Sequence, residues 1–136
     1  MSIQEMLRPH PSQAAHDESI ARCIEEAVAC AQTCTVCADA CLAEDDVAEL
    51  RRCIGLNLDC ADVCDTTARV LSRAGSSDFE LTRSVLLACI QACRSCGGEC
   101  ERHAEHHEHC RVCAESCRRC EEVCEKAVAS LTSRTG

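Results

Sequence analysis

The spacing of the cysteines constrains the fold of this chain more than any other feature of its sequence. Seventeen of the 136 residues are cysteine, and they fall into four segments. Within each segment successive cysteines are 3, 4 or 7 residues apart, steps that keep side chains on one face of an α-helix. The segments are Cys23, Cys30, Cys34, Cys37 and Cys41; Cys53, Cys60 and Cys64; Cys89, Cys93, Cys96 and Cys100; and Cys110, Cys113, Cys117, Cys120 and Cys124. Each segment therefore predicts a helix with thiols where a core helix ordinarily has leucine, isoleucine or valine.

The phase of these thiol stripes predicts where the helices end. The twelve residues from Cys41 to Cys53 and the ten from Cys100 to Cys110 put successive stripes on different faces, because each residue turns an α-helix by about 100°. Each of these gaps must therefore contain a turn. With a further turn before residue 78, the sequence predicts four long helices, at about 17–43, 46–73, 78–105 and 108–132.

Short motifs at the turns support these boundaries. Asp45 or Asp46 is suited to cap the second helix, since a short polar side chain can accept a free backbone N–H at a helix start. Gly75 predicts the end of the second helix, and Ser77 with Glu80 has the spacing of a capping box for the third. The connections between the helices are therefore short.

Short connections make sequential helices antiparallel neighbours. The predicted fold is all-α: an antiparallel up-down-up-down four-helix bundle with a cysteine-lined lumen. Ser2 and Glu5 form another capping box and predict a short helix near residues 3–8. We expect three parts: an N-terminal extension at 1–16, the metal-binding bundle at 17–132 and a C-terminal tail at 133–136.

The two ends of the predicted bundle differ. At the end near the turn around Gly75 the stripes continue in aliphatic residues, which predict a hydrophobic plug. These residues are Ile20, Ile24, Val70, Leu71, Leu81, Val85, Val128 and Leu131. The other end is rich in histidine: His103 and His107 continue the stripe that ends at Cys100, and we regard them as candidate metal ligands, whereas His106 and His109 are less well aligned.

Composition and charge argue against several classes of protein. The formal net charge of −9 disfavours nucleic acid as a partner, because binding it requires a basic surface. The sequence contains no apolar run of about 18 residues, so it predicts no membrane span, and its first residues lack the apolar stretch of a signal peptide. We therefore expect a cytoplasmic protein with reduced thiols, where disulfides across the helices are disfavoured.

Seventeen inward thiols indicate a soft metal. Packing alone does not explain them, because leucine at the same positions would bury more apolar area. Thiolates select Cu(I), Zn(II) and iron–sulfur clusters, and the sequence lacks the compact CxxCxxC motif common for iron–sulfur ligation. Zn(II) with four thiolates has a net charge of −2, which is costly to bury several times. Cu(I) at nearly one ion per thiolate is almost neutral, so the pattern favours a multinuclear Cu(I) site.

The alternating CxxxC and CxxC motifs of the four stripes resemble those of the cytosolic bacterial copper storage proteins. Two examples are Cys30-x3-Cys34-x2-Cys37-x3-Cys41 and Cys110-x2-Cys113-x3-Cys117-x2-Cys120-x3-Cys124, and the resemblance covers about residues 17–132. It implies storage and sequestration of many Cu(I) ions per subunit, a homotetramer of bundles and no catalysis. It also implies that copper enters at the histidine-rich end. The predicted ligands are all seventeen cysteines with His103 and His107, and we expect a copper chaperone or a chelator to load and release the metal.

Two other functions stay open at this point. A zinc buffer, or a general buffer for soft metals, would use the same thiols but bind Zn(II) tightly and few Cu(I) ions. A thiol enzyme or redox sensor would need one cysteine set apart by a basic neighbour, and the repeated pattern sets none apart.

Overall fold

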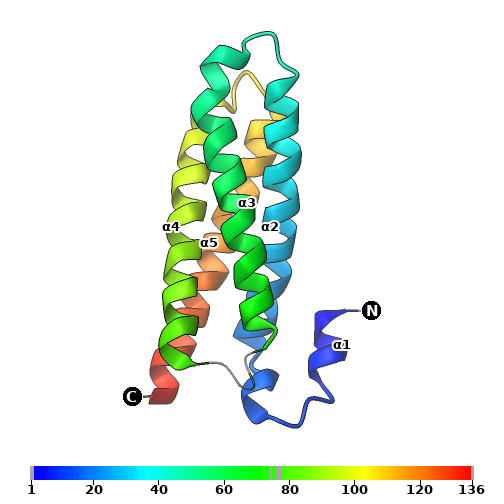
Figure 1. The fold of residues 1–136 in the computed structure, drawn as a ribbon, viewed down its shortest axis with the longest axis vertical. Helices are drawn as coiled ribbons and strands as arrows, with labels where there is room; N and C mark the ends of the chain where they lie inside the picture. The colour runs from blue at the N-terminus through cyan, green and yellow to red at the C-terminus, as the bar shows by residue number, and fades with distance from the viewer. Residues whose placement is uncertain (1, 74, 76–77, 136) are drawn as a thin grey trace.

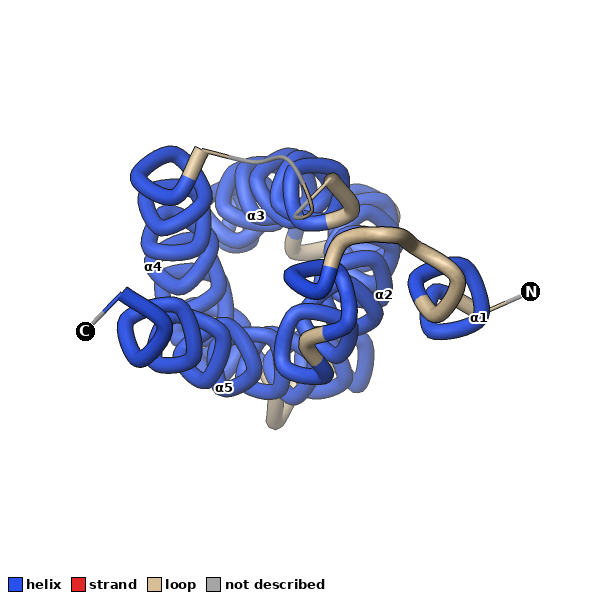
Figure 2. The backbone as a smooth tube through the Cα atoms, turned by 90° about the horizontal axis from the view of Figure 1, so that it is seen from below, coloured by secondary structure: helices blue, strands red, loops and turns tan. Residues whose placement is uncertain are grey.

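Four long antiparallel helices make up most of the molecule, which is described by a computed structural model at residues 2–73, 75 and 78–135. In chain order the elements are α1 (Ile3–Leu7), a 3-10 turn (Gln13–His16), α2 (Glu18–Leu42), a second 3-10 turn (Val47–Leu50), α3 (Arg51–Leu71), α4 (Phe79–His103) and α5 (Glu108–Thr135). The long helices run up and down in turn (Figure 1). Viewed along the axis they follow one another around it, and α1 lies outside α2 (Figure 2). The predicted all-α four-helix bundle is confirmed, and its division into extension, bundle and tail stays a prediction.

Side-chain caps mark the starts of α1 and α2. Ser2 Oγ accepts the backbone N–H of Glu5 at 3.1 Å, so the short predicted helix forms with its predicted cap. Asp17 caps α2 by accepting the backbone N–H of Ser19 at 2.8 Å. Its other carboxylate oxygen accepts the hydroxyl of Ser130 at 2.7 Å. The start of α2 is therefore bonded to the last turns of α5.

The turn between α2 and α3 differs from the prediction in one respect. Asp46 occupies the cap position of the 3-10 turn Val47–Leu50, but its side chain makes no cap bond there. Its carboxylate instead lies 3.0 Å from Nε2 of His107, in the opposite turn of the same end. The predicted capping bond is therefore wrong: the Asp46 carboxylate bonds to a histidine instead of to the helix start.

The connection between α3 and α4 also corrects two predicted caps. Ser77 lies outside the described residues, and the cap of α4 is Asp78, whose side chain accepts a backbone N–H three residues on at 3.1 Å. The predicted cap at Ser77 and the predicted helix start at residue 78 are therefore each one residue early, since α4 begins at Phe79. Helix α3 ends at Leu71 with Ser72 as its cap, and Gly75 has no left-handed conformation. Gly75 is therefore not the helix stop that was predicted.

The aliphatic plug at this end forms as predicted except at one residue of α4. Ile20, Ile24, Leu71 and Leu131 are buried as expected, and Val70, Val85 and Val128 are half-buried. Leu81, by contrast, is 55% exposed, and Leu86 is fully buried in the plug, with Thr82 on the same face. Leu81 lies eight residues before Cys89, which places it about 80° around the helix from the thiol stripe. Thr82 lies seven residues before Cys89 and only about 20° from the stripe, so Thr82 rather than Leu81 faces the core.

Helices α4 and α5 approach closely in the middle of the bundle. A Cβ atom added at Gly97 would lie 3.1 Å from Cβ of Cys117, whereas one added at Gly98 would meet nothing within 4 Å. The absence of a side chain at Gly97 thus allows α5 to place its thiols against those of α4. Along the described part of the chain, no helix combines the length and the apolar character that crossing a bilayer requires.

Candidate metal centre

All seventeen cysteines lie inside the bundle as free thiols, each with at most 1% of its surface exposed. Their sulfur atoms contact one another between helices as well as along them. Cys34 on α2 lies 3.9 Å from Cys96 on α4 and 3.9 Å from Cys117 on α5. Cys64 on α3 lies 3.7 Å from Cys93 on α4. The four stripes therefore meet in one continuous column of sulfur.

Within this column the sulfur atoms form overlapping groups of four, with all members of a group within 4.8 Å of one another. Three such groups lie in the interior: Cys30, Cys64, Cys93 and Cys120; Cys30, Cys34, Cys60 and Cys117; and Cys34, Cys96, Cys113 and Cys117. Cys30, Cys34 and Cys117 each belong to two of the three groups. Metal ions in neighbouring groups would therefore share thiolates, which suits a bridged multinuclear site better than separate mononuclear ones.

One residue of the column is an amide rather than a thiol. Asn57 is fully buried and lies between Cys53 and Cys60 at steps of four and three, the spacing of the stripe itself. Its Oδ1 accepts S–H hydrogen bonds from Cys96 at 3.1 Å and Cys113 at 3.4 Å, and its Nδ2 donates to Cys53 Sγ at 3.7 Å. Asn57 was not among the predicted site residues, although its spacing from Cys53 and Cys60 is that of a lumen residue.

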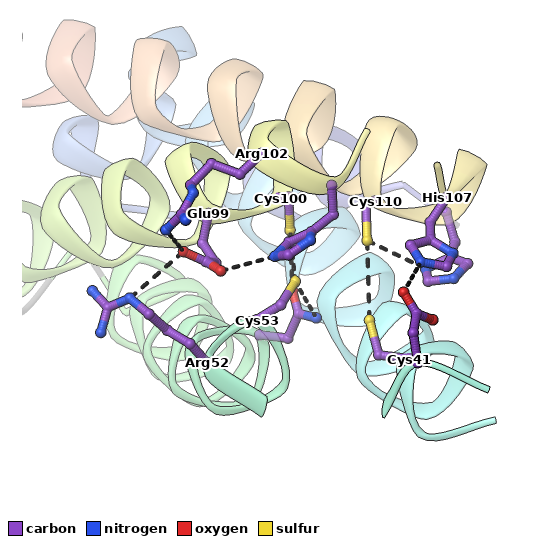
Figure 3. Close-up of polar contacts among 12 residues, drawn as sticks. Cys41, Arg52, Cys53, Glu99, Cys100, Arg102, His107 and Cys110 are labelled. Atoms are coloured by element: carbon purple, nitrogen blue, oxygen red, sulfur yellow. Dashed lines mark hydrogen bonds and ion pairs between the residues drawn. The ribbon is translucent and has the colours of Figure 1, made fainter. Parts of the chain in front are cut away.

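At the histidine-rich end, His103 is held by a buried carboxylate. Its Nε2 lies 2.9 Å from Oε2 of Glu99, which is only 7% exposed. The other oxygen of Glu99 lies 3.6 Å from Arg52 and 3.3 Å from Arg102, so the carboxylate sits between two guanidinium groups and the imidazole (Figure 3). The predicted ligand His103 thus lies at the rim of the lumen with one ring nitrogen occupied.

His107, the second predicted ligand, has both ring nitrogens against carboxylates from the turn between α2 and α3. Nδ1 lies 2.9 Å from Glu44 and Nε2 lies 3.0 Å from Asp46. The hydrogen bond to Asp46 is the main reason why the pKa of His107 is raised. A metal ion could bind His107 only by displacing one of these carboxylates.

His109, which the sequence did not favour, contacts thiols directly. Its Nδ1 lies 3.5 Å from Sγ of Cys37 and 3.7 Å from Sγ of Cys110. Together with Cys41 these atoms form a further group within 4.8 Å, here called the mouth group. Sulfur atoms of Cys41 and Cys110 face each other at 4.0 Å (Figure 3). The structure therefore adds His109 to the candidate ligands.

Burial disfavours the charged thiolate of Cys41 in the absence of metal. It raises the pKa of Cys41 to about 11, and the neighbouring Cys37 adds to the effect. Because a thiol binds a metal as its thiolate, uptake must release protons, and metal affinity must fall as the pH falls.

A four-helix bundle whose axis is lined with free thiols defines a class of protein built to hold soft metal ions in its core. Residues 16–129 match the copper storage protein family, and the chain belongs to that family. It is 53% identical to the copper storage protein of Streptomyces lividans, in a structure loaded with 10 copper equivalents, with a TM-score of 0.90 over 94% of this chain and 98% of that one.

Two further comparisons agree with this assignment. A structure of copper loading to a cytosolic copper storage protein from Streptomyces lividans, with five coppers, is 59% identical, with a TM-score of 0.81 over 82% of this chain and 93% of that one. The uncharacterized cysteine-rich protein YhjQ of Bacillus subtilis (strain 168) is 33% identical over 107 residues, which are 79% of this chain and 94% of that protein.

Proposed function

We propose that this protein stores and sequesters many Cu(I) ions in the cytoplasm, bound by the thiolates along the axis of its bundle. The observation that carries the proposal is the sharing of Cys30, Cys34 and Cys117 between neighbouring groups of sulfur atoms. A thiolate that bridges two Cu(I) ions lets the number of ions approach the number of thiols and keeps the charge of the filled column near zero. The copper-loaded structures of the similar Streptomyces lividans protein support this proposal.

All seventeen cysteines are the proposed ligands, and copper enters at the end where His103, His107 and His109 lie. Support for this direction comes from the difference between the ends. One is closed by buried aliphatic residues, and the other presents three half-buried imidazoles, of which that of His109 contacts thiols. His107 would hold copper only in competition with Glu44 and Asp46. Such a ligand suits the transfer of an ion toward the thiols better than its retention.

The proposed role is storage without catalysis. The thiol nearest to a histidine, Cys37, is only 1% exposed and belongs to the mouth group. An enzyme nucleophile or a redox sensor needs access to its substrate or oxidant, and this thiol is buried among potential metal ligands. A copper chaperone or a chelator is the proposed partner for loading and release.

Titration of the reduced, metal-free protein with Cu(I), in competition with a Cu(I)-specific chelator, tests the proposal. We expect saturation at a number of ions comparable to the seventeen thiols, because nearly every thiolate bridges two ions. Far-UV circular dichroism should change little, since the helices are already formed around the column. Saturation at a few ions per chain would contradict multinuclear storage.

We also propose that the bundles assemble into a homotetramer, as the resemblance to the family implies. Apolar side chains on the outer faces of the helices offer surface for such contacts: Val28, Val36, Leu42, Leu58, Leu87 and Val112 are between 41% and 60% exposed. Light scattering coupled to size-exclusion chromatography should give the mass of four chains, and the mass of a single chain would contradict the proposal.

A further inference from the structure

The mouth group differs from the interior groups in its donor atoms. It combines three sulfur atoms, from Cys37, Cys41 and Cys110, with Nδ1 of His109, whereas the three interior groups contain only sulfur. Three cysteines and one histidine form one of the closed ligand sets that hold structural Zn(II). The donor set alone therefore makes this end of the column suitable for a borderline divalent metal as well as for Cu(I).

The spacing of these donors fits a single tetrahedral ion. The Zn–S and Zn–N bond lengths found in proteins place sulfur atoms about 3.8 Å apart and a sulfur and a nitrogen about 3.6 Å apart. Here Cys41 and Cys110 are 4.0 Å apart (Figure 3), and Nδ1 of His109 lies 3.5 Å from Cys37 and 3.7 Å from Cys110. The other distances in the group are within 4.8 Å, so adjustments of up to about 1 Å would complete the tetrahedron.

Glu44 holds the imidazole in the orientation that such a site requires. Its Oε2 lies 2.8 Å from Nε2 of His109 and 2.9 Å from Nδ1 of His107. When the Nε2–H group of His109 donates a hydrogen bond to this carboxylate, Nδ1 is unprotonated and its lone pair points toward the thiols. A carboxylate behind a ligating histidine is the usual arrangement at zinc sites, where it fixes the tautomer and the direction of the ring.

Charge directs a divalent ion to the mouth group rather than to the interior. Zn(II) with three thiolates and a neutral imidazole has a net charge of −1, whereas Zn(II) with four thiolates has −2. Every sulfur of the interior groups is fully buried, while His109 is 23% exposed. The sulfur atoms of the mouth group are buried too, but one of its four ligands is partly exposed, so the smaller charge has a ligand in contact with water whereas the larger one would be buried wholly in the column.

From these four observations we infer that the mouth group is a site for one zinc-type divalent ion in the copper-free protein. The ion would tie α2, through Cys37 and Cys41, to α5, through His109 and Cys110, across the open end of the column. Because Cu(I) is the softer ion and prefers thiolates, it displaces the divalent ion as the column fills. Only this displacement rests on the proposed storage function; binding of the divalent ion does not.

Titration of the reduced, copper-free full chain with Zn(II) alone, against a chromophoric zinc chelator, tests the inference. We expect one tightly bound ion per chain. Co(II) in place of Zn(II) should give the absorption of a tetrahedral ion with thiolate ligands. The His109→Ala variant should bind Zn(II) about tenfold more weakly or worse, and Glu44→Gln about 10 to 100-fold more weakly. His106→Ala, which changes an exposed histidine of the same segment, is the matched control and should bind as the unchanged protein does.

The outcomes separate this inference from the storage function. Zinc binding that is equally tight in the His109→Ala and Glu44→Gln variants, or that saturates at several equivalent ions per chain, would overturn the mouth site even if Cu(I) loading is complete. One zinc ion lost in both variants and kept in His106→Ala supports the site even if the Cu(I) capacity proves small. Circular dichroism of each variant checks that its helices are formed.

Discussion

The triple replacement of Cys30, Cys34 and Cys117 by serine is expected to lower the Cu(I) capacity of each chain by more than three ions, although it removes only three thiols. Each of these thiols belongs to two interior groups, so the variant leaves the three groups with three, one and two sulfur atoms. Ions that depended on the lost bridges would lose binding too, because a serine hydroxyl is a hard ligand with little affinity for Cu(I). Competition titration with a Cu(I)-specific chelator gives the capacity.

The matched control replaces three thiols that are not shared among these groups. Cys60, Cys64 and Cys96 each belong to one of the three interior groups, so their replacement leaves three sulfur atoms in each. This variant should lose close to the three ions that its missing thiols would hold. Equal losses in the two triple variants would show that the ions are held independently of bridging. Both variants can keep their helices, since a hydroxyl inside a helix can donate to the carbonyl four residues earlier, as Thr33 and Thr35 do at 2.8 Å.

The thiol spacing predicts the bundle because one pattern reports both the helices and the faces that meet. Steps of three and four identify each helix, and the loss of phase between Cys41 and Cys53 identifies a turn. The ends of the helices were less predictable, because they depend on partners distant in the sequence. Aspartate commonly caps helices, yet Asp46 bonds to His107 instead. Only the folded bundle brings these two residues together.

The candidate site shows the same division. The inward position of each thiol can be predicted from its spacing along a single helix, and all seventeen thiols are buried as that spacing predicts. His109 lies four residues before Cys113, so it shares the face of α5 that carries the thiols. Its contact with Cys37, however, depends on how closely α2 approaches α5. Glu44 could not be predicted either, since its role arises from a turn that meets two histidines of the opposite turn.

Replacing Leu86 with alanine is expected to destabilise the copper-free protein by about 2–5 kcal/mol, the usual cost of truncating a buried leucine. A loss of this size should lower the melting temperature by roughly 10 °C in a domain of this length. Leu86 is fully buried in the plug beside the column, and each cysteine of the column buries less apolar area than a leucine would. The aliphatic end should therefore supply a large share of the stability of the metal-free state.

Leu81→Ala is the matched control for this prediction, because Leu81 belongs to the same helix and is 55% exposed. It should change stability by no more than about 0.5 kcal/mol. Thermal and urea denaturation of the reduced protein, in the presence of a chelator, measures both variants. A similar loss in Leu81→Ala would contradict the position of the plug in the structure. Loading with Cu(I) should raise the melting temperature of Leu86→Ala, because ions that bind only the native state stabilise it in proportion to the logarithm of their concentration over the dissociation constant.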